Sequence, residues 1–373
     1  MNVERYDHPW QIAQLTGLAD DVDRVLRSGS YVLGAEVREF EAAFAAHTGT
    51  DYAVGVNSGT DALVLALRAL GIGPGDEVIT AANTFHATVL AIFAVGALPR
   101  LVDCRPDDWL IDLDAVADAI NERTAAILPV HLFGRAVLMA PLLELARRHG
   151  LAVVEDCAQA VGARDDGQRV GSLSDAGCFS FHPSKNLSAA GDGGALTTNR
   201  EDVAEACRQM RSLGQAGQNH HVVRGVNSKL DELQALLLRR KLPLVDGWNE
   251  RRRAVAARYE ARLRGTGVEP APLVEDERHV YHLFQVEVAD RDGLLAGLRD
   301  AGVDAVVRYP TPPHRQPAFA GALEGQGPFP AAERQAAATL CLPMRASLTV
   351  EEVDYVCETV TRLASPVAGG SRS

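Results

Sequence analysis

Short apolar runs alternate with amphipathic segments through the first half of the chain. The apolar runs predict strands at 53–56, 77–80, 98–102, 125–130, 151–155 and 195–198. Between them, apolar residues recur every three or four positions, which predicts helices over 61–70, 87–95, 114–121 and 139–149. Such alternation is typical of a largely parallel sheet covered by helices, whose ligands bind at the carboxyl ends of the strands.

The flanking segments follow different patterns. Residues 11–47 are predicted to be helical, with a break at 29–34. A long arginine-rich helical stretch covers 229–264 and is interrupted near Pro243. We expect this stretch to link two domains.

The C-terminal third contains both the two-residue alternation typical of strands and the three- to four-residue spacing typical of helices. Alternation over 281–288 predicts a half-exposed antiparallel strand. A helix is predicted over 294–301 and a strand over 304–309. Thr349 and Glu352 form a capping-box pattern that opens a final helix.

The chain has 373 residues, which is long for one compact domain. We expect a large domain with an N-terminal helical segment over 1–245 and a small domain over 246–365. The glycine- and serine-rich end, 366–373, is predicted to be a disordered tail.

Charge and cysteine content narrow the functional classes. The 49 acidic residues exceed the 37 lysines and arginines, which does not favour a nucleic-acid partner. No long uncharged stretch predicts a membrane helix and no signal peptide is visible, so we expect a cytoplasmic protein. The six cysteines lack a Cys-x-x-Cys pair, and the histidines (182, 220 and 221 among them) lack ligand spacing, so we expect free thiols and no metal.

The strongest chemical signal surrounds Lys185. This amine follows Ser180 and runs into a glycine-rich turn at 191–194, while Asp156 ends an apolar run 29 residues upstream. Taken singly, Lys185 fits a surface lysine and Asp156 fits a structural salt bridge. Together they are what pyridoxal phosphate requires: a lysine for the Schiff base, a carboxylate for the pyridine nitrogen and hydroxyls for the phosphate.

Three further motifs are each open to two interpretations, and a fourth residue, Gln159, has one. Gly59 and Thr60 open a helix, and they fit either a phosphate-binding turn or a plain N-cap. Phe85 fits either stacking on a flat cofactor ring or a place in the core. Gln159 lies three residues after Asp156 and is expected near the ring, and Asn227 fits either a phosphate donor or a helix cap.

Taken together, these segments resemble the DegT/DnrJ/EryC1/StrS family of nucleotide-sugar aminotransferases. The resemblance extends from about residue 10 to 365. The matching segments are 57–63, 129–134, 155–160, 179–195, 225–234, 308–310, 314, 316–317 and 342–344.

The resemblance implies an α/β protein with the type I aspartate-aminotransferase-like fold. This fold has a large domain with a mostly parallel seven-stranded sheet and a smaller α+β C-terminal domain. The resemblance also implies a homodimer with active sites shared at the subunit interface.

Residue roles follow from the same resemblance. Lys185 is the lysine that bonds to pyridoxal 5′-phosphate, and Asp156 pairs with the pyridine nitrogen. The other implied cofactor contacts are Gly59, Thr60 and Ser180 at the phosphate, Phe85 on the ring, Gln159 beside it, and Asn227 at the phosphate of the partner's cofactor. The residues implied near the sugar are His182, Tyr309 and His314.

The implied reaction moves an amino group from L-glutamate, or glutamine, to C3 or C4 of a dTDP-linked keto-6-deoxyhexose, for an antibiotic or surface sugar. Relatives that carry histidine in place of the lysine are dehydratases, so Lys185 argues against dehydration. Ser188 departs from the glycine common in the family. Two alternatives stay open: a keto-cyclitol aminotransferase, and a non-catalytic pyridoxal-phosphate-binding regulatory protein.

Overall fold

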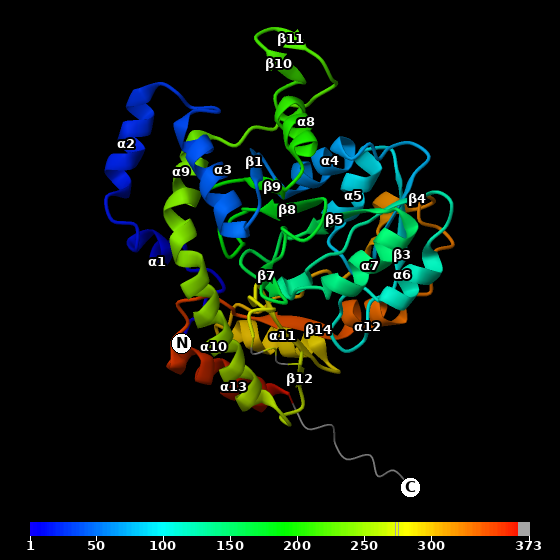
Figure 1. Ribbon diagram of the computed structural model, residues 1–373. Helices are drawn as coiled ribbons and strands as arrows, with labels where there is room; N and C mark the ends of the chain where they lie inside the picture. The colour runs from blue at the N-terminus through cyan, green and yellow to red at the C-terminus, as the bar shows by residue number, and fades with distance from the viewer. Residues whose placement is uncertain (273, 275, 365–373) are drawn as a thin grey trace.

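A seven-stranded sheet forms the centre of the molecule (Figure 1). The computed structural model describes residues 1–272, 274 and 276–364, so the expected disordered tail lies outside the described residues. In spatial order the strands are β1 (Tyr52–Val56), β9 (Gly194–Thr198), β8 (Ala176–Ser180), β5 (Ala152–Asp156), β4 (Thr124–Ile127), β2 (Glu77–Ala81) and β3 (Leu98–Val102). Only β9 runs antiparallel to its neighbours in this sheet, which confirms the expected mostly parallel arrangement.

The apolar pattern predicts six of these strands and misses one. The strand expected at 125–130 ends at Ile127, because Pro129 has no N–H to continue the ladder. The missed strand is β8, which is interrupted by Gly177. A Cβ at that position would lie 2.3 Å from the Cα of Gly171, so a close backbone approach excludes the apolar side chain that would have marked the strand.

The two faces of the sheet bury separate apolar clusters. Along β8, Cys178 faces the side covered by α4 (Gly59–Ala69), whereas Phe179 faces the side covered by α3 (Ala35–Thr48) and α9 (Glu232–Lys241). The Phe179 ring meets Phe44 of α3 edge-on, with centroids 4.9 Å apart. Alternate residues of one strand therefore anchor both helical layers.

The remaining helices before residue 245 connect the strands of the central sheet or precede it. Their bounds are α1 (His8–Ala13), α2 (Leu18–Ser28), α5 (His86–Ala94), α6 (Leu113–Ala119), α7 (Met139–His149) and α8 (Glu201–Arg211). The predicted helix at 139–149 is confirmed with the same bounds. Two short hairpins add β6 (Arg164–Asp165) with β7 (Gln168–Arg169), and β10 (Gln215–Gly217) with β11 (His220–His221).

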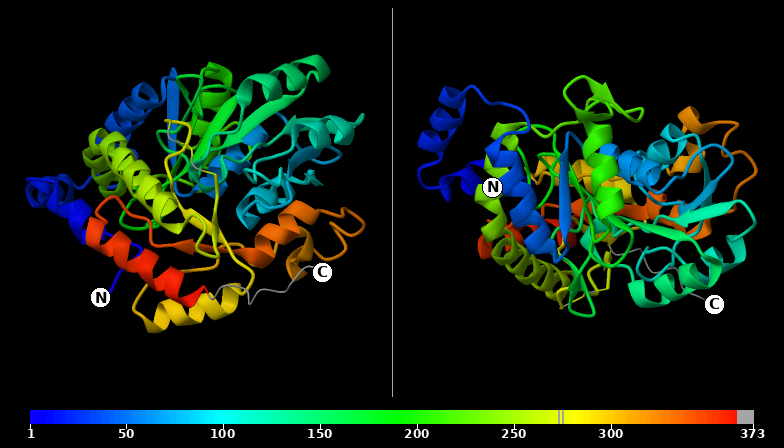
Figure 2. Two further views of the ribbon diagram at one scale, coloured as in Figure 1. Left: turned by 90° about the horizontal axis from the view of Figure 1, so that it is seen from below. Right: turned by 45° about the horizontal axis from the view of Figure 1, so that its top comes forward.

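The C-terminal part is a three-stranded antiparallel sheet packed with helices. Its elements are α10 (Val245–Leu263), β12 (Glu269–Pro270), β13 (Phe284–Glu287), α11 (Arg291–Asp300), α12 (Pro330–Ala338), β14 (Thr339–Leu342) and α13 (Val350–Leu363). A 3₁₀ turn at Leu242–Leu244 separates α9 from α10, as Pro243 predicts. Helices α10 and α13 lie side by side (Figure 2), and the predicted capping box of Thr349 and Glu352 opens α13.

Two expectations for this part are wrong. The antiparallel strand expected within 281–288 is present as β13, but residues 281–286 are all buried instead of half-exposed, because Leu283 joins the core of the central sheet while Phe284 joins the C-terminal core. Residues 304–309 form a single bridge, Val306 with Cys341, instead of a strand. The chain then turns at Tyr309, whose φ of 56° is left-handed, and this turn brings its side chain to the cavity described below.

The N-terminal residues reach the C-terminal part. Val3 pairs with Val303 and belongs to the C-terminal core. The division at 245/246 stays a prediction. All six cysteines are buried and free, and no helix among the described residues is long and apolar enough to cross a membrane.

Candidate active site

A cavity of about 250 Å³ opens where the parallel strands end. The segments after β1, β2, β5 and β8 supply one wall, and the C-terminal part supplies the other. The cavity brings together the sequence-predicted residues Gly59, Thr60, Phe85, Asp156, Gln159, Ser180, His182, Lys185 and Tyr309.

Lys185 follows β8 in a turn that also contains His182. The backbone N–H of Lys185 donates to the carbonyl oxygen of His182 at 2.8 Å, which fixes the lysine's backbone against the cavity. Burial lowers the pKa of the Lys185 amine to about 8, although the carboxylate of Asp156 opposes this shift and Arg308 adds to it. A pKa near 8 gives a neutral amine population of roughly a tenth at pH 7, against roughly three in ten thousand for an ordinary lysine.

Asp156 lies at the end of β5 and is buried. Its Oδ2 accepts a hydrogen bond from the Thr88 hydroxyl at 2.8 Å, and its Oδ1 accepts one from the backbone N–H of Ala158 at 3.1 Å. Burial raises the pKa of this carboxyl, whereas the two hydrogen bonds oppose that shift because they favour the ionised form. A cationic N–H in the cavity would favour the ionised form, and the carboxylate retains lone pairs to accept it.

The beginning of α4 faces the cavity together with Ser180. The hydroxyl of Ser58 caps the helix by accepting from the N–H of Asp61 at 3.1 Å, and Gly59 and Thr60 form the first turn. A Cβ on Gly59 would lie 2.7 Å from the Cβ of Ser180, so glycine lets the helix end approach this hydroxyl. Free N–H groups, a helix dipole and hydroxyls form a cradle for a phosphate.

An aromatic and amide wall completes the cavity. The Gln159 side chain accepts from the N–H of Phe133 at 2.6 Å and donates to the Tyr309 hydroxyl at 2.6 Å. Phe85 packs on Tyr309, with ring centroids 5.5 Å apart, and stays 45% exposed. Its exposed face is thus free to stack on a planar ligand, and the core alternative for Phe85 is wrong.

Together these features fit pyridoxal phosphate. Lys185 offers the amine, Asp156 offers an acceptor for the pyridine N–H, and the start of α4 with Ser180 offers the anion cradle.

Two expected residues lie outside this cavity. Asn227 is exposed, and its Oδ1 accepts from the Lys229 amine at 2.5 Å. His314 faces Glu333, with 2.9 Å between Nε2 and Oε1, and packs edge-on against Phe329. Their assigned roles stay predictions.

Sequence reasoning missed cavity residues as well. The structure adds Asp192, His282 and Arg308 to the cavity, and it shows that Thr88 holds Asp156 from outside the cavity lining. Thr88 is detectable only as a hydroxyl four positions after Thr84 on α5. His282 carries no local signal, and Arg308 was found only as part of the matching segment 308–310 without a role. The two residues lie 97 and 123 positions after Lys185 in the chain.

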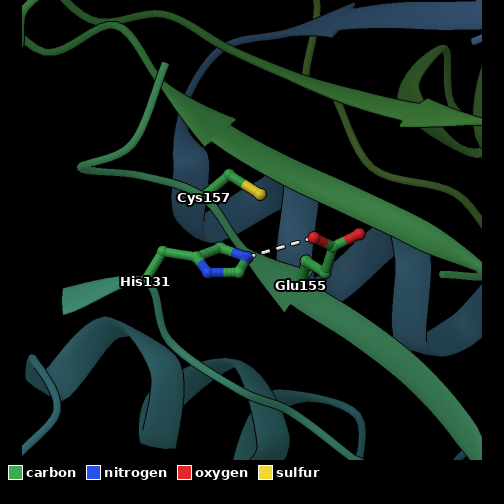
Figure 3. A group of neighbouring side chains, drawn as sticks. All are labelled: His131, Glu155 and Cys157. Atoms are coloured by element: carbon green, nitrogen blue, oxygen red, sulfur yellow. Dashed lines mark hydrogen bonds and ion pairs between the residues drawn. The ribbon is translucent and has the colours of Figure 1, made fainter. Parts of the chain in front are cut away.

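A second cluster joins His131, Glu155 and Cys157 (Figure 3). All three are buried. His131 Nε2 lies 3.1 Å from Glu155 Oε2, while its Nδ1 accepts from the N–H of Val137 at 3.0 Å. The Glu155 carboxylate also accepts from the hydroxyl of Ser174 and the backbone N–H groups of residues 171 and 173. These bonds satisfy the polar groups without an ion, and they fix the end of β5 beside Asp156.

Comparison with known proteins identifies the class. The family model of the DegT/DnrJ/EryC1/StrS aminotransferase family matches residues 16–361. The dTDP-3-amino-3,4,6-trideoxy-alpha-D-glucose transaminase of Streptomyces venezuelae is 46% identical over 347 residues, which cover 93% of this chain and 92% of that protein.

Solved structures agree with this class. The S. venezuelae DesV structure, in complex with a ketimine intermediate, superposes with a TM-score of 0.95 at 44% identity and covers 98% of this chain and 99% of its own. NtdA from Bacillus subtilis, with bound cofactor PMP, gives a TM-score of 0.89 at 33% identity and covers 97% and 83%.

The fold and the relatives define a pyridoxal-phosphate-dependent sugar aminotransferase of fold type I. The chain belongs to the DegT/DnrJ/EryC1/StrS aminotransferase family. This result confirms the expected enzyme class.

Proposed function

We propose that this protein transfers an amino group from L-glutamate, or glutamine, to a keto carbon of a dTDP-linked keto-6-deoxyhexose. The observation that carries the proposal is that Lys185, Asp156 and the start of α4 line one cavity. Of the two carbons expected, C3 and C4, the name of the S. venezuelae relative favours C3. The pathway proposed is deoxysugar biosynthesis for an antibiotic or surface sugar.

Lys185 is proposed to move the protons. Its low pKa leaves enough neutral amine to take the proton from the donor's α-carbon and to deliver a proton to C4′ of the cofactor. For the keto-sugar the same amine moves protons in the opposite order. Pyridoxal phosphate, when bound, supplies the electron sink for the carbanion formed at these carbons.

Asp156 is proposed to hold the proton on the pyridine nitrogen. The hydroxyl of Thr88 and the N–H of Ala158 keep one oxygen each in place, so the carboxylate is oriented before the ligand enters. Gly59, Thr60 and Ser180 are proposed to bind the phosphate, and Phe85 to stack on the ring.

Gln159 is proposed to lie beside the ring. Its hydrogen bond to Tyr309 ties the wall after β5 to the C-terminal wall. Tyr309 and His182 are proposed to line the sugar position, because both face the same cavity. His314 is proposed to reach the sugar from outside the cavity, where it now faces Glu333.

A homodimer with shared sites is also proposed. Asn227 lies outside its own cavity, which suits a residue that serves the partner's cofactor phosphate. Several large apolar side chains near it and near the N-terminal helices are exposed: Leu26, Tyr31, Val32, Leu213, Val222 and Val223. A second copy of the chain would cover them. We propose that the dimer acts in the cytoplasm.

The test separates substrates by class. The holoenzyme is first converted to its amino-group-carrying form with L-glutamate or L-glutamine. The released product, 2-oxoglutarate or 2-oxoglutaramate, is measured. The converted enzyme is then offered a dTDP-3-keto-6-deoxyhexose, its 4-keto isomer or a keto-cyclitol. Amination of the 3-keto sugar supports the proposal. Amination of only the keto-cyclitol would overturn it in favour of that alternative substrate.

A further inference from the structure

A chain of buried amides fixes the ring of His282 in the active-site cavity. The side chain of Asn249 in α10 donates from Nδ2 to the carbonyl oxygen of Val161 at 2.9 Å. Its Oδ1 accepts from Nδ2 of Asn186 at 2.9 Å, and the same Nδ2 donates to the carbonyl oxygen of Val280 at 3.0 Å. Because a backbone carbonyl oxygen only accepts, these contacts set the orientation of both amides.

This orientation determines which nitrogen of the His282 ring carries the proton. Asn186 presents its Oδ1 to His282 Nδ1 at 3.2 Å. An amide oxygen only accepts, so Nδ1 must donate, and in the neutral ring Nε2 then carries a lone pair. Within residues 1–272, 274 and 276–364, Asn186 is the one hydrogen-bond partner of this buried ring. Nε2 is therefore left to accept from a group in the cavity.

The surroundings of His282 keep its ring neutral. Burial lowers the pKa of His282 well below the ordinary value, and the charges of Lys185, Arg252 and Arg308 add to this shift, as does His182. Asn186, its side-chain partner, is uncharged. The ring thus keeps the Nε2 lone pair at neutral pH.

Lys185 is the donor nearest to this acceptor along the chain of contacts. Asn186, which orients the ring, follows Lys185 directly in the sequence. Lys185 and His282 both line the active-site cavity, and both also line a smaller cavity of about 20 Å³ beside it. One water needs about 10–15 Å³, so the two nitrogens can be joined directly or through one water. A protonated lysine amine has three N–H donors and no acceptor, which complements a lone pair.

We propose that Nε2 of His282 accepts a hydrogen bond from the protonated amine of Lys185 and so positions this amine for proton transfer. The inference rests on the proposed function, in which Lys185 takes a proton from the donor's α-carbon and delivers it to C4′. The proton stays on Nζ between these two steps, and His282 gains none. A neutral acceptor stabilises the protonated amine without the attraction of a second carboxylate, which would retain the proton more strongly. His282 is thus a positioning residue that acts through Lys185.

The test measures the basicity of Lys185 itself. The chain contains three lysines, at positions 185, 229 and 241. Protein labelled with ¹³C at lysine Cε and loaded with pyridoxamine phosphate, which leaves Lys185 unbonded, therefore gives three titrating signals. The signal of Lys185 is the one that Lys185→Met removes. Because the acceptor favours the protonated amine, we expect His282→Asn to move the titration of Lys185 to lower pH.

Two variants separate the two nitrogens of the ring. His282→Asn keeps an amide N–H near the position of Nδ1 but has no atom near Nε2. His282→Gln places an amide oxygen near Nε2 but loses the donor to Asn186, so we expect a Lys185 titration closer to the wild type. A purely structural role of the contact with Asn186 would give the reverse order and overturn the inference.

A matched control lies three residues earlier. His279 is equally buried, but it does not line the active-site cavity. His279→Asn should therefore leave the titration of Lys185 unchanged. An unchanged or higher titration midpoint of Lys185 in His282→Asn would overturn the inference, as would an equal shift in His279→Asn.

Kinetics of the holoenzyme distinguish Lys185 from a substrate as the partner of Nε2. We expect His282→Asn to slow the reaction with L-glutamate about tenfold, as for loss of one hydrogen bond to a charged group. The deuterium isotope effect with α-deuterated L-glutamate should increase, because proton transfer becomes slower. A normal rate with the amino donor and a slower reaction with the keto-sugar would assign Nε2 to a sugar hydroxyl and overturn the inference.

Failure of the proposed function gives a different result. If the wild-type holoenzyme reacts with neither L-glutamate nor L-glutamine, the proposed donor is wrong, while the titration of Lys185 still tests the hydrogen bond. If the wild type reacts and His282→Asn leaves the titration of Lys185 unchanged, only the role of His282 is refuted.

Discussion

Thr88 allows the role of Asp156 to be tested without removing the carboxylate. Thr88→Val keeps the shape of a fully buried side chain but removes the hydroxyl that donates to Asp156 Oδ2 at 2.8 Å. A hydrogen bond to a charged group contributes about 1.5–3 kcal/mol. Because this bond favours the ionised carboxylate, its loss is expected to raise the pKa of Asp156 further.

The effect of a higher Asp156 pKa is measurable in the first half of the reaction, in which the amino donor reacts with the holoenzyme. At neutral pH we expect the rate with L-glutamate to fall about 10- to 100-fold, since each 1.4 kcal/mol is about tenfold. The loss should shrink as the pH is raised, because the carboxylate then ionises again. The assay is stopped-flow absorbance of the holoenzyme at a series of pH values on both sides of neutrality.

A matched control variant lies one turn away. Thr84 is equally buried and shares a 2.7 Å hydrogen bond with Thr88, but it does not contact Asp156. Thr84→Val should therefore cost less than Thr88→Val. A loss in Thr88→Val that is the same at every pH, or that Thr84→Val reproduces, would refute the reasoning.

Three further predictions follow from single side chains. Lys185→Ala is expected to abolish turnover because no other amine is proposed to move the protons, and wild-type-like activity would refute the assignment. Gly59→Ala places a Cβ 2.7 Å from Ser180, so pyridoxal phosphate affinity, measured by titration of the apoprotein, should fall about tenfold or more, whereas an unchanged affinity would contradict the cradle. Burial lowers the pKa of Lys241 from 10.5 to about 8, so the unfolded chain binds more protons between these pH values and the free energy of unfolding rises with pH there. In urea unfolding of the apoprotein, Lys241→Met should reduce the rise of the free energy of unfolding with pH. Part of the rise should remain, because Lys185 also contributes to it. An unchanged rise would contradict the effect of burial on Lys241.

Local signals made the central part of the site predictable. Asp156 ends one predicted strand and the turn at Gly59 follows another, so their sequence neighbours reveal where they lie. Lys185 was recognised from its own motif, because β8, the strand before it, was not predicted. The carboxyl ends of those strands meet at one edge of the sheet, and the structure indeed places all three around one cavity.

The opposite wall was not predictable in this way. Arg308 and His282 come from the C-terminal part, and only tertiary packing brings them to Lys185. The strand expected over 304–309 was wrong in part because Tyr309 has a left-handed backbone. A periodic pattern of apolar residues does not indicate that one residue has a positive φ. Strand β8 was missed because Gly177 interrupts its apolar run. Glycine is required there by the close approach of the backbone at Gly171.

The most direct test of the central claim is the visible absorption of the purified holoenzyme during two successive additions. The account predicts that L-glutamate or L-glutamine removes the absorption of protein-bound pyridoxal phosphate, and that a dTDP-3-keto-6-deoxyhexose then restores it while the sugar gains an amine. Absorption that neither donor changes, or that no keto-sugar nucleotide restores, would contradict the proposed reaction.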